Sequence, residues 1–286
     1  MNKPASIRAR LLNKAKAENK DFSLILIRYA LERLLYRLSI SSSKDNFLLK
    51  GALLLDMWFD IPYRSTRDID LLGFGLAEEP LVYEAFSEIC GIDCDDGLIF
   101  DANSIRIAEI RKEANYSGLR VTLIGHLDGA RSLVQVDIGY EDAVTPAPDL
   151  AEYPVMLKDL PAPKLRVYPR YTVVAEKFEA IVSLGMANTR LKDYFDLWIL
   201  LKTQRLDPEL LKTAIAATLN RRKTIMPAST PVGLTSVFGE DAQKTKQWQA
   251  FIKKNQLKAP ALHLTIDFIQ EKLKASISNI NMHVNE

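Results

Sequence analysis

Two aspartates separated by a single residue, Asp68 and Asp70, have the residue type and spacing needed to bind a divalent cation. They lie in segment 64–72, which is predicted to be a strand because polar and apolar residues alternate around the two aspartates. Successive strand side chains point to opposite faces, so both carboxylates and Thr66 share one face while the intervening apolar residues enter the core. Two ionised carboxylates this close repel each other, and a divalent cation relieves that repulsion. Short acidic pairs are common in proteins, so this pair indicates a metal site only if the surrounding residues support one.

A third carboxylate, Asp137, interrupts the apolar segment 132–139, where β-branched residues at alternate positions predict another strand. An ionised acid inside such a strand is costly unless it is paired or binds a metal. We therefore expect Asp137 to be the third carboxylate of the site. The alternative is an acid at the solvent edge of its strand.

A glycine, Gly51, precedes the acidic pair. The apolar segment 47–50 predicts a short strand, and the leucines after Gly51 predict a helix to about residue 59. A glycine at such a turn lets backbone N–H groups approach a ligand closely, and a helix N-terminus favours phosphate. The alternative is an ordinary turn glycine.

The remaining elements are expected to position these side chains. Apolar residues at three- and four-residue steps predict helices, and alternation predicts strands. The helices are expected at two places within 5–39 and at 77–90, 171–184, 190–201, 210–219, 243–254 and 259–277, and the strands at 100–110 and 120–124. The proline-rich segment 146–169 is interpreted as a connection to a helical lobe. We thus expect an α/β (α+β) fold, with a mixed sheet and flanking helices in residues 1–168 and a C-terminal helical domain in residues 169–286.

Composition is that of a soluble protein with a substantial core, since 48% of the 286 residues are hydrophobic and 26% are charged. The net charge of +2 creates no global field for nucleic acid, but residues 3–20 and 190–223 are locally basic. Such runs are usually solvated helix faces and less often bind phosphates. Cys90 and Cys94 are interpreted as ordinary thiols, because two cysteines form no disulfide framework. Neither a secretory signal nor a membrane span is evident, so a cytoplasmic protein without a membrane partner is expected.

Taken in order, the strand, Gly51, the helix, the acidic pair and the later strand acid resemble the nucleotidyltransferase superfamily of the DNA polymerase β type. The resemblance is closer to the AbiEii/AbiGii-type nucleotidyltransferase toxins, the toxin halves of bacterial type IV toxin–antitoxin and phage-abortive systems. It covers roughly residues 5–200. The segments that carry it are Phe47-Leu-Leu-Lys-Gly-Ala52, Arg64-Ser-Thr-Arg-Asp-Ile-Asp-Leu-Leu-Gly73, Ala175-Glu-Lys-Phe178 and Arg190-Leu-Lys-Asp-Tyr-Phe-Asp-Leu197.

This resemblance implies roles for individual residues. Asp68 and Asp70 would bind metal, with Asp137 at the superfamily's third position, and the cofactor would be Mg²⁺, as two ions. Lys177 would bind the triphosphate, and Asp193 would hold Lys177 or the acceptor in place. The nucleotide would also lie near Lys50, Gly51, Ser65, Thr66, Arg190 and Lys192. One departure is Ala52, where many nucleotidyltransferases have Gly, Ser or Thr, so that Ser65 or Thr66 would have to supply the hydroxyl.

The implied function is Mg²⁺-dependent transfer of a nucleotide from an NTP to an RNA hydroxyl, notably the tRNA 3′ end. This would block translation and growth unless a cognate antitoxin restrains the enzyme. Two alternatives remain. One is an antibiotic-modifying (small-molecule) nucleotidyltransferase or kinase on the same scaffold. The other is a catalytically silent module that binds RNA or protein, although the presence of all three carboxylates and Lys177 argues against lost catalysis.

Overall fold

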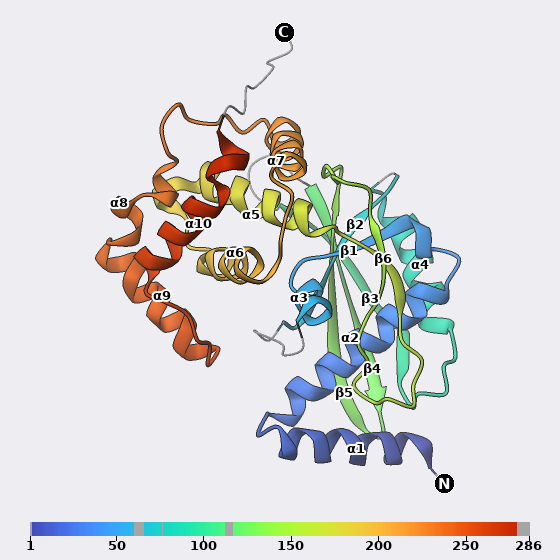
Figure 1. Ribbon diagram of the computed structural model, residues 1–286. Helices are drawn as coiled ribbons and strands as arrows, with labels where there is room; N and C mark the ends of the chain where they lie inside the picture. The colour runs from blue at the N-terminus through green and yellow to red at the C-terminus, as the bar shows by residue number, and fades with distance from the viewer. Residues whose placement is uncertain (1, 60–65, 76, 112–116, 279–286) are drawn as a thin grey trace. The chain divides into compact units, whose positions relative to one another are not determined.

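The computed structural model describes residues 2–59, 66–75, 77–111 and 117–278 (Figure 1). Its helices of eight or more residues are α1 (Lys3–Ala17), α2 (Phe22–Ile40), α4 (Glu79–Gly91), α5 (Arg170–Leu184), α6 (Leu191–Thr203), α7 (Pro208–Arg222), α9 (Ala242–Lys254) and α10 (Leu262–Ile277). Shorter helices are α3 (Leu53–Trp58) and α8 (Ser236–Gly239). The strands are β1 (Phe47–Lys50), β2 (Asp68–Gly73), β3 (Ile99–Arg111), β4 (Ser117–Leu127), β5 (Ala130–Tyr140), β6 (Asp149–Glu152) and β7 (Lys164–Val167).

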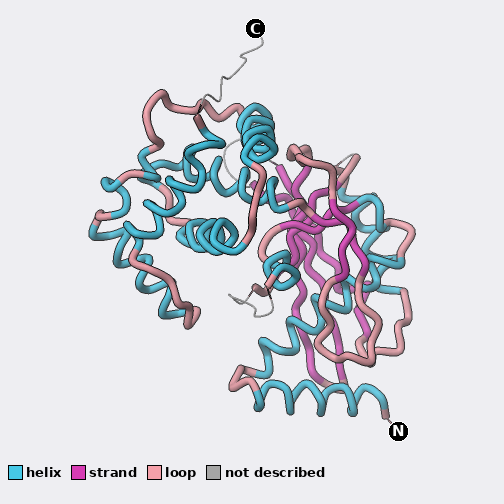
Figure 2. Tube along the Cα trace, in the orientation of Figure 1, coloured by secondary structure: helices cyan, strands magenta, loops and turns pink. Residues whose placement is uncertain are grey.

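The chain forms two compact units. Unit 1 comprises Met1–Glu141 and Asp149–Val167, and unit 2 comprises Asp142–Pro148 and Tyr168–Glu286. Unit 1 holds the sheet, whereas the described residues of unit 2 form helices and loops without a strand (Figure 2). The expected domains, 1–168 and 169–286, are continuous in sequence, and these units are not.

Unit 1 is built on a seven-stranded mixed sheet with the order β3-β4-β5-β2-β1-β7-β6. The central strand β2 lies antiparallel to β1 and parallel to β5. Strands β3, β4 and β5 form an antiparallel meander, and β7 pairs with β1 in parallel. The expected mixed α/β sheet with flanking helices and a C-terminal helical region is confirmed.

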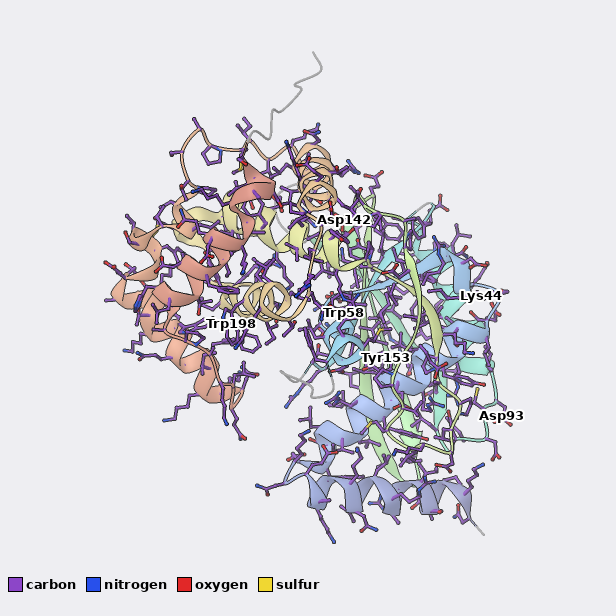
Figure 3. All side chains as sticks on the ribbon, viewed as in Figure 1. Lys44, Trp58, Asp93, Asp142, Tyr153 and Trp198 are labelled. Atoms are coloured by element: carbon purple, nitrogen blue, oxygen red, sulfur yellow. The ribbon has the colours of Figure 1, made fainter. Side chains whose placement is uncertain are left out.

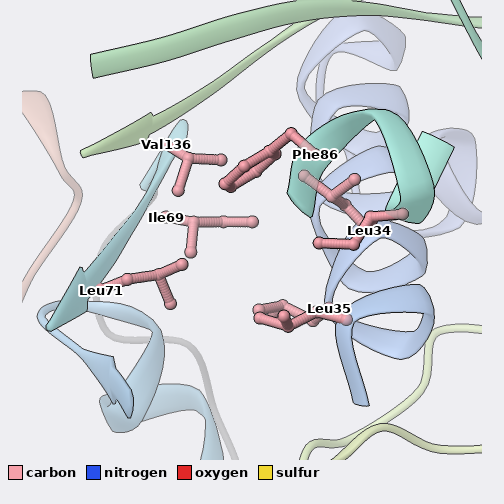
Figure 4. Close-up of a pocket in the computed structure, with 8 residues that line it drawn as sticks. Leu34, Leu35, Ile69, Leu71, Phe86 and Val136 are labelled. Carbon is pink, nitrogen blue, oxygen red and sulfur yellow. The ribbon is translucent and has the colours of Figure 1, made fainter. Parts of the chain in front are cut away.

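One face of this sheet is apolar and packs against α2 and α4. Ile69 and Leu71 of β2 and Val136 of β5 point toward Leu34 of α2 and Phe86 of α4 across a small apolar cavity (Figure 4). All five side chains are at most 2% exposed. Because side chains alternate along a strand, the residues between these core positions lie on the opposite face, which carries the site.

Helix α2 also buries charge, which fastens it to the rest of unit 1. The Arg37 guanidinium donates to both carboxylate oxygens of Asp96 at 2.7 and 3.1 Å, and each side chain is 2% exposed. One turn earlier, Arg33 pairs with Glu32 at 2.9 Å, and Glu32 accepts a hydrogen bond from the Met156 backbone N–H at 2.6 Å. The contacts with Asp96 and with the Met156 backbone fix α2 to segments distant in the sequence.

Unit 2 gathers α5, α6, α7 and α10 around an apolar core, in which α5 packs on α7 and α10 packs on α6. Segment 142–148 joins this unit through polar contacts. The Arg222 guanidinium of α7 binds Asp142 at 3.1 Å, and the Thr172 hydroxyl donates to the Thr145 carbonyl at 2.9 Å. Asp142 is labelled in Figure 3. Arg222 also pairs with Glu179 of α5 at 2.7 Å, so one guanidinium joins three parts of the chain.

Two short strands and one short helix were not expected from the sequence. The proline-rich segment interpreted as a connection contains β6 and β7, which pair with each other and extend the sheet beyond β1. Each has only four residues, too few to show a clear alternation between flanking prolines. Helix α8 likewise lies in a segment expected to be non-helical. The other expected helices and strands are present with end shifts of a few residues.

Within the described residues, no helix has the length and apolarity required to cross a membrane. Cys90 and Cys94 are not disulfide-bonded. Burial raises the pKa of the Cys90 thiol to about 11, so it is an unreactive thiol at neutral pH.

Candidate active site

The two carboxylates of β2 lie on the sheet face opposite the apolar core. Asp68 and Asp70 are half-buried, whereas Ile69 between them is 1% exposed. The Thr66 hydroxyl donates to Asp68 Oδ1 at 2.6 Å, which orients that carboxylate. Thr66 therefore joins the carboxylate face through a direct contact with the acidic pair.

Gly51 is fitted against the second carboxylate. Its φ is +75°, a conformation that side-chain-bearing residues rarely adopt. A Cβ at this position would lie 2.8 Å from both Cβ and Cγ of Asp70. Because β1 pairs Lys50 with Asp70, the turn after β1 passes directly beside the Asp70 carboxylate. The glycine is thus required by the close approach of Asp70 as well as by the turn.

Strand register places four charged residues in one row across the sheet. Lys50 of β1 pairs with Asp70 of β2, Asp70 pairs with Asp137 of β5, and Asp137 pairs with Arg120 of β4. Paired residues on neighbouring strands present their side chains to the same face. The row therefore consists of two carboxylates flanked by two cations, with Asp68 one strand step away on the same face.

Asp137 is held by an arginine. Arg120 Nε donates to Asp137 Oδ1 at 2.8 Å and Nη2 donates to Oδ2 at 3.0 Å, a bidentate pair. The Asp137 side chain is 6% exposed and that of Arg120 is 40% exposed. The hydrogen bonds that Arg120 donates to Asp137 raise the pKa of Arg120 against the opposing effect of burial, and the charges of Asp137, Asp68 and Asp70 raise it further. Arg120 is therefore a permanent cation of the carboxylate face.

The carboxylates do not converge as a ready three-ligand metal site. Among the described residues, no three His, Cys, Asp or Glu side chains are grouped so that they could hold a metal ion. Asp68 and Asp70 have the donor type that Mg²⁺ prefers and share one face. Asp137 has the same donor type, but both of its oxygens are bound by Arg120. The acidic pair thus fits a Mg²⁺ ion, and Asp137 as placed does not.

Unit 2 carries a second charged cluster around Lys177 of α5. Lys177 Nζ donates to Asp193 Oδ1 at 2.9 Å and to Asp196 Oδ2 at 2.7 Å, both from α6. The two aspartate side chains are 1% exposed, and that of Lys177 is 14% exposed. The three-residue spacing puts both acids on the face of α6 that meets α5. Lys177 is therefore anchored by two carboxylates, of which sequence reasoning assigned only Asp193 to the site.

Arg190 completes this cluster at the start of α6. Its Nε lies 2.7 Å from Asp193 Oδ2. Burial acts to raise the pKa of Asp193, but the charges of Lys177 and Arg190 outweigh it and lower that pKa below its ordinary value. The preceding loop is fixed by Asn188, whose side chain accepts from the Arg190 backbone N–H at 2.7 Å. Lys192, the next expected cation, is exposed.

The expected site residues thus fall into two groups, each described within its own unit. Unit 1 contains Lys50, Gly51, Thr66, Asp68, Asp70 and Asp137, and unit 2 contains Lys177, Arg190, Lys192 and Asp193. Ser65 lies outside the described residues. Sequence reasoning missed Arg120, which only the strand register connects to Asp137, and Asp196, whose spacing from Asp193 was a usable signal.

The two locally basic runs are partly occupied by ion pairs. In the first run, Arg10 pairs with Asp159 and Lys14 pairs with Glu18 on the surface. In the second, Arg222 is bound by carboxylates including Asp142 and Glu179. Arg222 therefore has an internal structural role.

Comparison with known proteins gives a family and a fold. The family model described as "Nucleotidyl transferase AbiEii toxin, Type IV TA system" matches residues 33–274. Among solved structures, MenT4, a nucleotidyltransferase toxin from Mycobacterium tuberculosis H37Rv, superposes with a TM-score of 0.58 at 14% identity, over 98% of this chain and 90% of that one. A putative nucleotidyltransferase from H. pylori has a TM-score of 0.48 at 16% identity, over 85% of this chain and 92% of that one. No curated protein sequence matches the chain.

Proposed function

The chain belongs to the AbiEii family of nucleotidyltransferase toxins of type IV toxin–antitoxin systems, and from this premise we propose that it transfers a nucleotide from an NTP to an RNA hydroxyl. The acceptor we propose is the 3′ end of tRNA, where an added nucleotide blocks aminoacylation and so translation. A cognate antitoxin protein would restrain this activity in the cytoplasm. The observation that carries the proposal is the acidic pair Asp68 and Asp70 on one strand face, with Gly51 fitted against it.

We assign the metal-binding role to the acidic pair. Asp68, held by the Thr66 hydroxyl, and Asp70, beside the Gly51 turn, would hold Mg²⁺. Mg²⁺ at this position would offset phosphate charge and lower the pKa of the attacking hydroxyl. The glycine lets the backbone approach a phosphate, and Lys50, paired with Asp70 across the strands, adds a cation to the same face.

Lys177 is assigned to the triphosphate, with Asp193 and Asp196 as its anchors. A lysine held by two buried carboxylates keeps a fixed direction, which suits a phosphate that must be bound in one geometry. Arg190 and the exposed Lys192 are further candidates for phosphate contacts. Ser65 and Thr66 remain candidates for a nucleotide-binding hydroxyl.

The test is transfer of label from each of four α-labelled NTPs to total bacterial RNA in the presence of Mg²⁺. We expect label in a tRNA-sized band with the wild-type protein and loss of at least about 100-fold with Asp70→Asn, because the metal then loses a charged ligand. Asp149→Asn is the matched control, since Asp149 is an exposed strand aspartate of the same sheet. Label on a small molecule alone would favour the antibiotic-modifying alternative, and no label with any acceptor would favour the binding module.

Lys177 requires a charge-balanced variant. Lys177→Ala alone leaves Asp193 and Asp196 buried without their shared cation, which costs roughly 3–5 kcal/mol of stability. The informative pair is Lys177→Ala/Asp196→Asn against Asp196→Asn, because the two differ only at the lysine. We expect the double variant to fold and to lose transfer. The single variant should transfer more than the double variant, because Asp193 still anchors Lys177 in it. Equal transfer by both would remove Lys177 from the site.

A further inference from the structure

Two residues of the charged row across the sheet, Arg120 and Asp137, have no role in the reaction proposed above. We propose that Arg120 binds a phosphate group of the nucleotide and that Asp137 positions it for this purpose, rather than acting as a metal ligand. The inference rests on the proposed function, because it assigns a residue to the nucleotide of that same reaction.

Both carboxylate oxygens of Asp137 are occupied by Arg120. A carboxylate with a guanidinium bound to both oxygens, at 2.8 and 3.0 Å, is already neutralised and hydrogen-bonded. A cation at Asp137 would have to displace Arg120 from a side chain that is 6% exposed. Gln135 Nε2 also lies 3.4 Å from Asp137 Oδ1 and leaves less room for a cation beside this oxygen. These contacts are those of a residue that holds an arginine in place.

Arg120 remains accessible to a ligand. Although it is locked to Asp137, 40% of its side chain remains exposed. Only Nε and Nη2 bind Asp137, so the outward N–H groups of the fork, including those of Nη1, point away from the carboxylate. A guanidinium held on one edge presents its other edge in a fixed orientation, and that edge matches the oxygens of a phosphate.

Arg120 lies on the same sheet face as the acidic pair. It ends the row in which Asp137 and Asp70 are neighbours, so it lies two strands from the Asp70 carboxylate on the same face. With strands about 4.8 Å apart, that separation is about 10 Å, and a long arginine side chain spans part of it. A nucleotide whose phosphates are held near Asp68 and Asp70 lies within reach of this guanidinium. The polyanion would then meet a cation on each side of the acidic pair, Lys50 and Arg120.

The test compares Arg120→Ala, Arg120→Lys, Asp137→Asn and the double variant Arg120→Ala/Asp137→Asn. We expect Arg120→Ala and Asp137→Asn each to raise the KM for the NTP by about 10- to 100-fold with a smaller change in kcat. The double variant should match Arg120→Ala, since Asp137 acts through the arginine. Arg120→Lys should stay impaired, because an ammonium cannot bind Asp137 and a phosphate through one rigid fork. Arg131→Ala is the control: Arg131 is an exposed arginine of β5, about 20 Å along that strand from Asp137.

Two binding measurements keep the outcome independent of transfer activity. Mn²⁺ titrated into the nucleotide-free protein should bind to wild type and Asp137→Asn alike, and more weakly to Asp70→Asn. An NTP analogue with a methylene bridge between the α- and β-phosphates should bind more weakly to Arg120→Ala. Loss of Mn²⁺ binding in Asp137→Asn, or unchanged analogue binding in Arg120→Ala, overturns the proposal. If the protein binds Mn²⁺ and analogue but labels no acceptor, the proposed function fails while the assignment of Arg120 stands.

The double variant also guards against misfolding. Arg120→Ala leaves Asp137 buried without its guanidinium, whereas the double variant removes both charges. If the single variant unfolds, the double variant decides: an analogue affinity equal to that of wild type overturns the proposal.

Discussion

At the scale of single residues, the site is defined by close approaches that leave little freedom for substitution. Gly51 shows this most clearly. Its φ of +75° costs any other residue roughly 1–2 kcal/mol, and a side chain there would also press on Asp70. The same glycine therefore determines both the turn and the position of a carboxylate.

We expect Gly51→Ala to lower both stability and transfer activity, because its Cβ has to displace Asp70. Gly129→Ala is the matched control, since Gly129 has a φ of +77° and nothing lies within 4 Å of where its Cβ would be. The control should lose roughly 1–2 kcal/mol from backbone strain alone and keep its activity. Urea unfolding and NTP labelling measure the two effects. Equal activity in both alanine variants would show that the Asp70 contact has no functional role.

Sequence reasoning identified Asp68, Asp70 and their common face because strand alternation is a local property. It predicted Asp137 as a ligand because an acid in an apolar strand needs a partner, and the structure supplies that partner as Arg120. Which partner it is depends on the register between β4 and β5, and the sequence of either strand alone does not contain that information. Asp196 lies in the segment 190–197 that carries the family resemblance, but the resemblance assigned a role only to Asp193 in that segment.

At the scale of elements, α2 combines an apolar stripe with charges that ordinary helices expose. Its apolar residues were enough to predict the helix, and Figure 4 shows how they meet β2 and β5. Glu32, Arg33 and Arg37 occur within this helix, and no pattern in its residues indicated that all three are at most 2% exposed. The short strands β6 and β7 were missed for the opposite reason, since four residues carry too little pattern.

Buried charge in α2 predicts a pH dependence of stability. Burial raises the pKa of Glu32 to about 7, against the opposing effects of Arg33 and the Met156 N–H. In the unfolded chain Glu32 titrates near its ordinary value of 4.5. Between these two pH values the folded state binds the Glu32 proton more tightly than the unfolded chain does. The stabilisation of the folded state that results is complete below about pH 4.5 and is lost as the pH rises through about 7. The loss is roughly 3 kcal/mol.

Urea unfolding of wild type and Glu32→Gln at pH 5 and pH 8 measures this contribution. We expect the stability of Glu32→Gln relative to wild type to be greater at pH 8 than at pH 5, because only the wild type must bury an ionised carboxylate at the higher pH. Glu84→Gln, at an exposed position of α4, should show no such change. A constant difference between wild type and Glu32→Gln across this range would contradict the assignment.

At the scale of the whole molecule, the chain builds unit 2 from two separate segments. Composition and periodicity predicted a sheet-containing part followed by a helical part, because these are properties of long segments. They gave no indication that residues 142–148 belong with the helices, since that assignment depends on side-chain contacts such as Asp142 with Arg222.

We expect Arg222→Met to destabilise the parts of unit 2 that contact Arg222, including those that are far from it in the sequence. Hydrogen exchange should rise in α5, in α7 and in segment 142–148, because Arg222 belongs to α7 and its guanidinium binds groups in the other two. Lys212→Met removes a different cation of α7 and should leave segment 142–148 unchanged. Faster exchange confined to α7 after Arg222→Met would show that the segment does not depend on this contact.

The passage of the chain between units has a consequence for inheritance. The chain enters unit 2 at residue 142, returns to unit 1 at 149 and enters unit 2 again at 168. A single recombination event near residue 168 between two related genes would give the descendant a helical unit from one parent and its short segment, with Asp142 and Thr145, from the other. Such a hybrid keeps its contacts only where the residue at position 142 from one parent suits the residue at 222 from the other, and where position 172 has a hydroxyl to bind the backbone of residue 145. The gene segment that encodes the helical unit is therefore interrupted by the segment that encodes residues 149–167 of the sheet-containing unit. The two units are expected to evolve together, because one exchange cannot transfer unit 2 without also transferring part of unit 1.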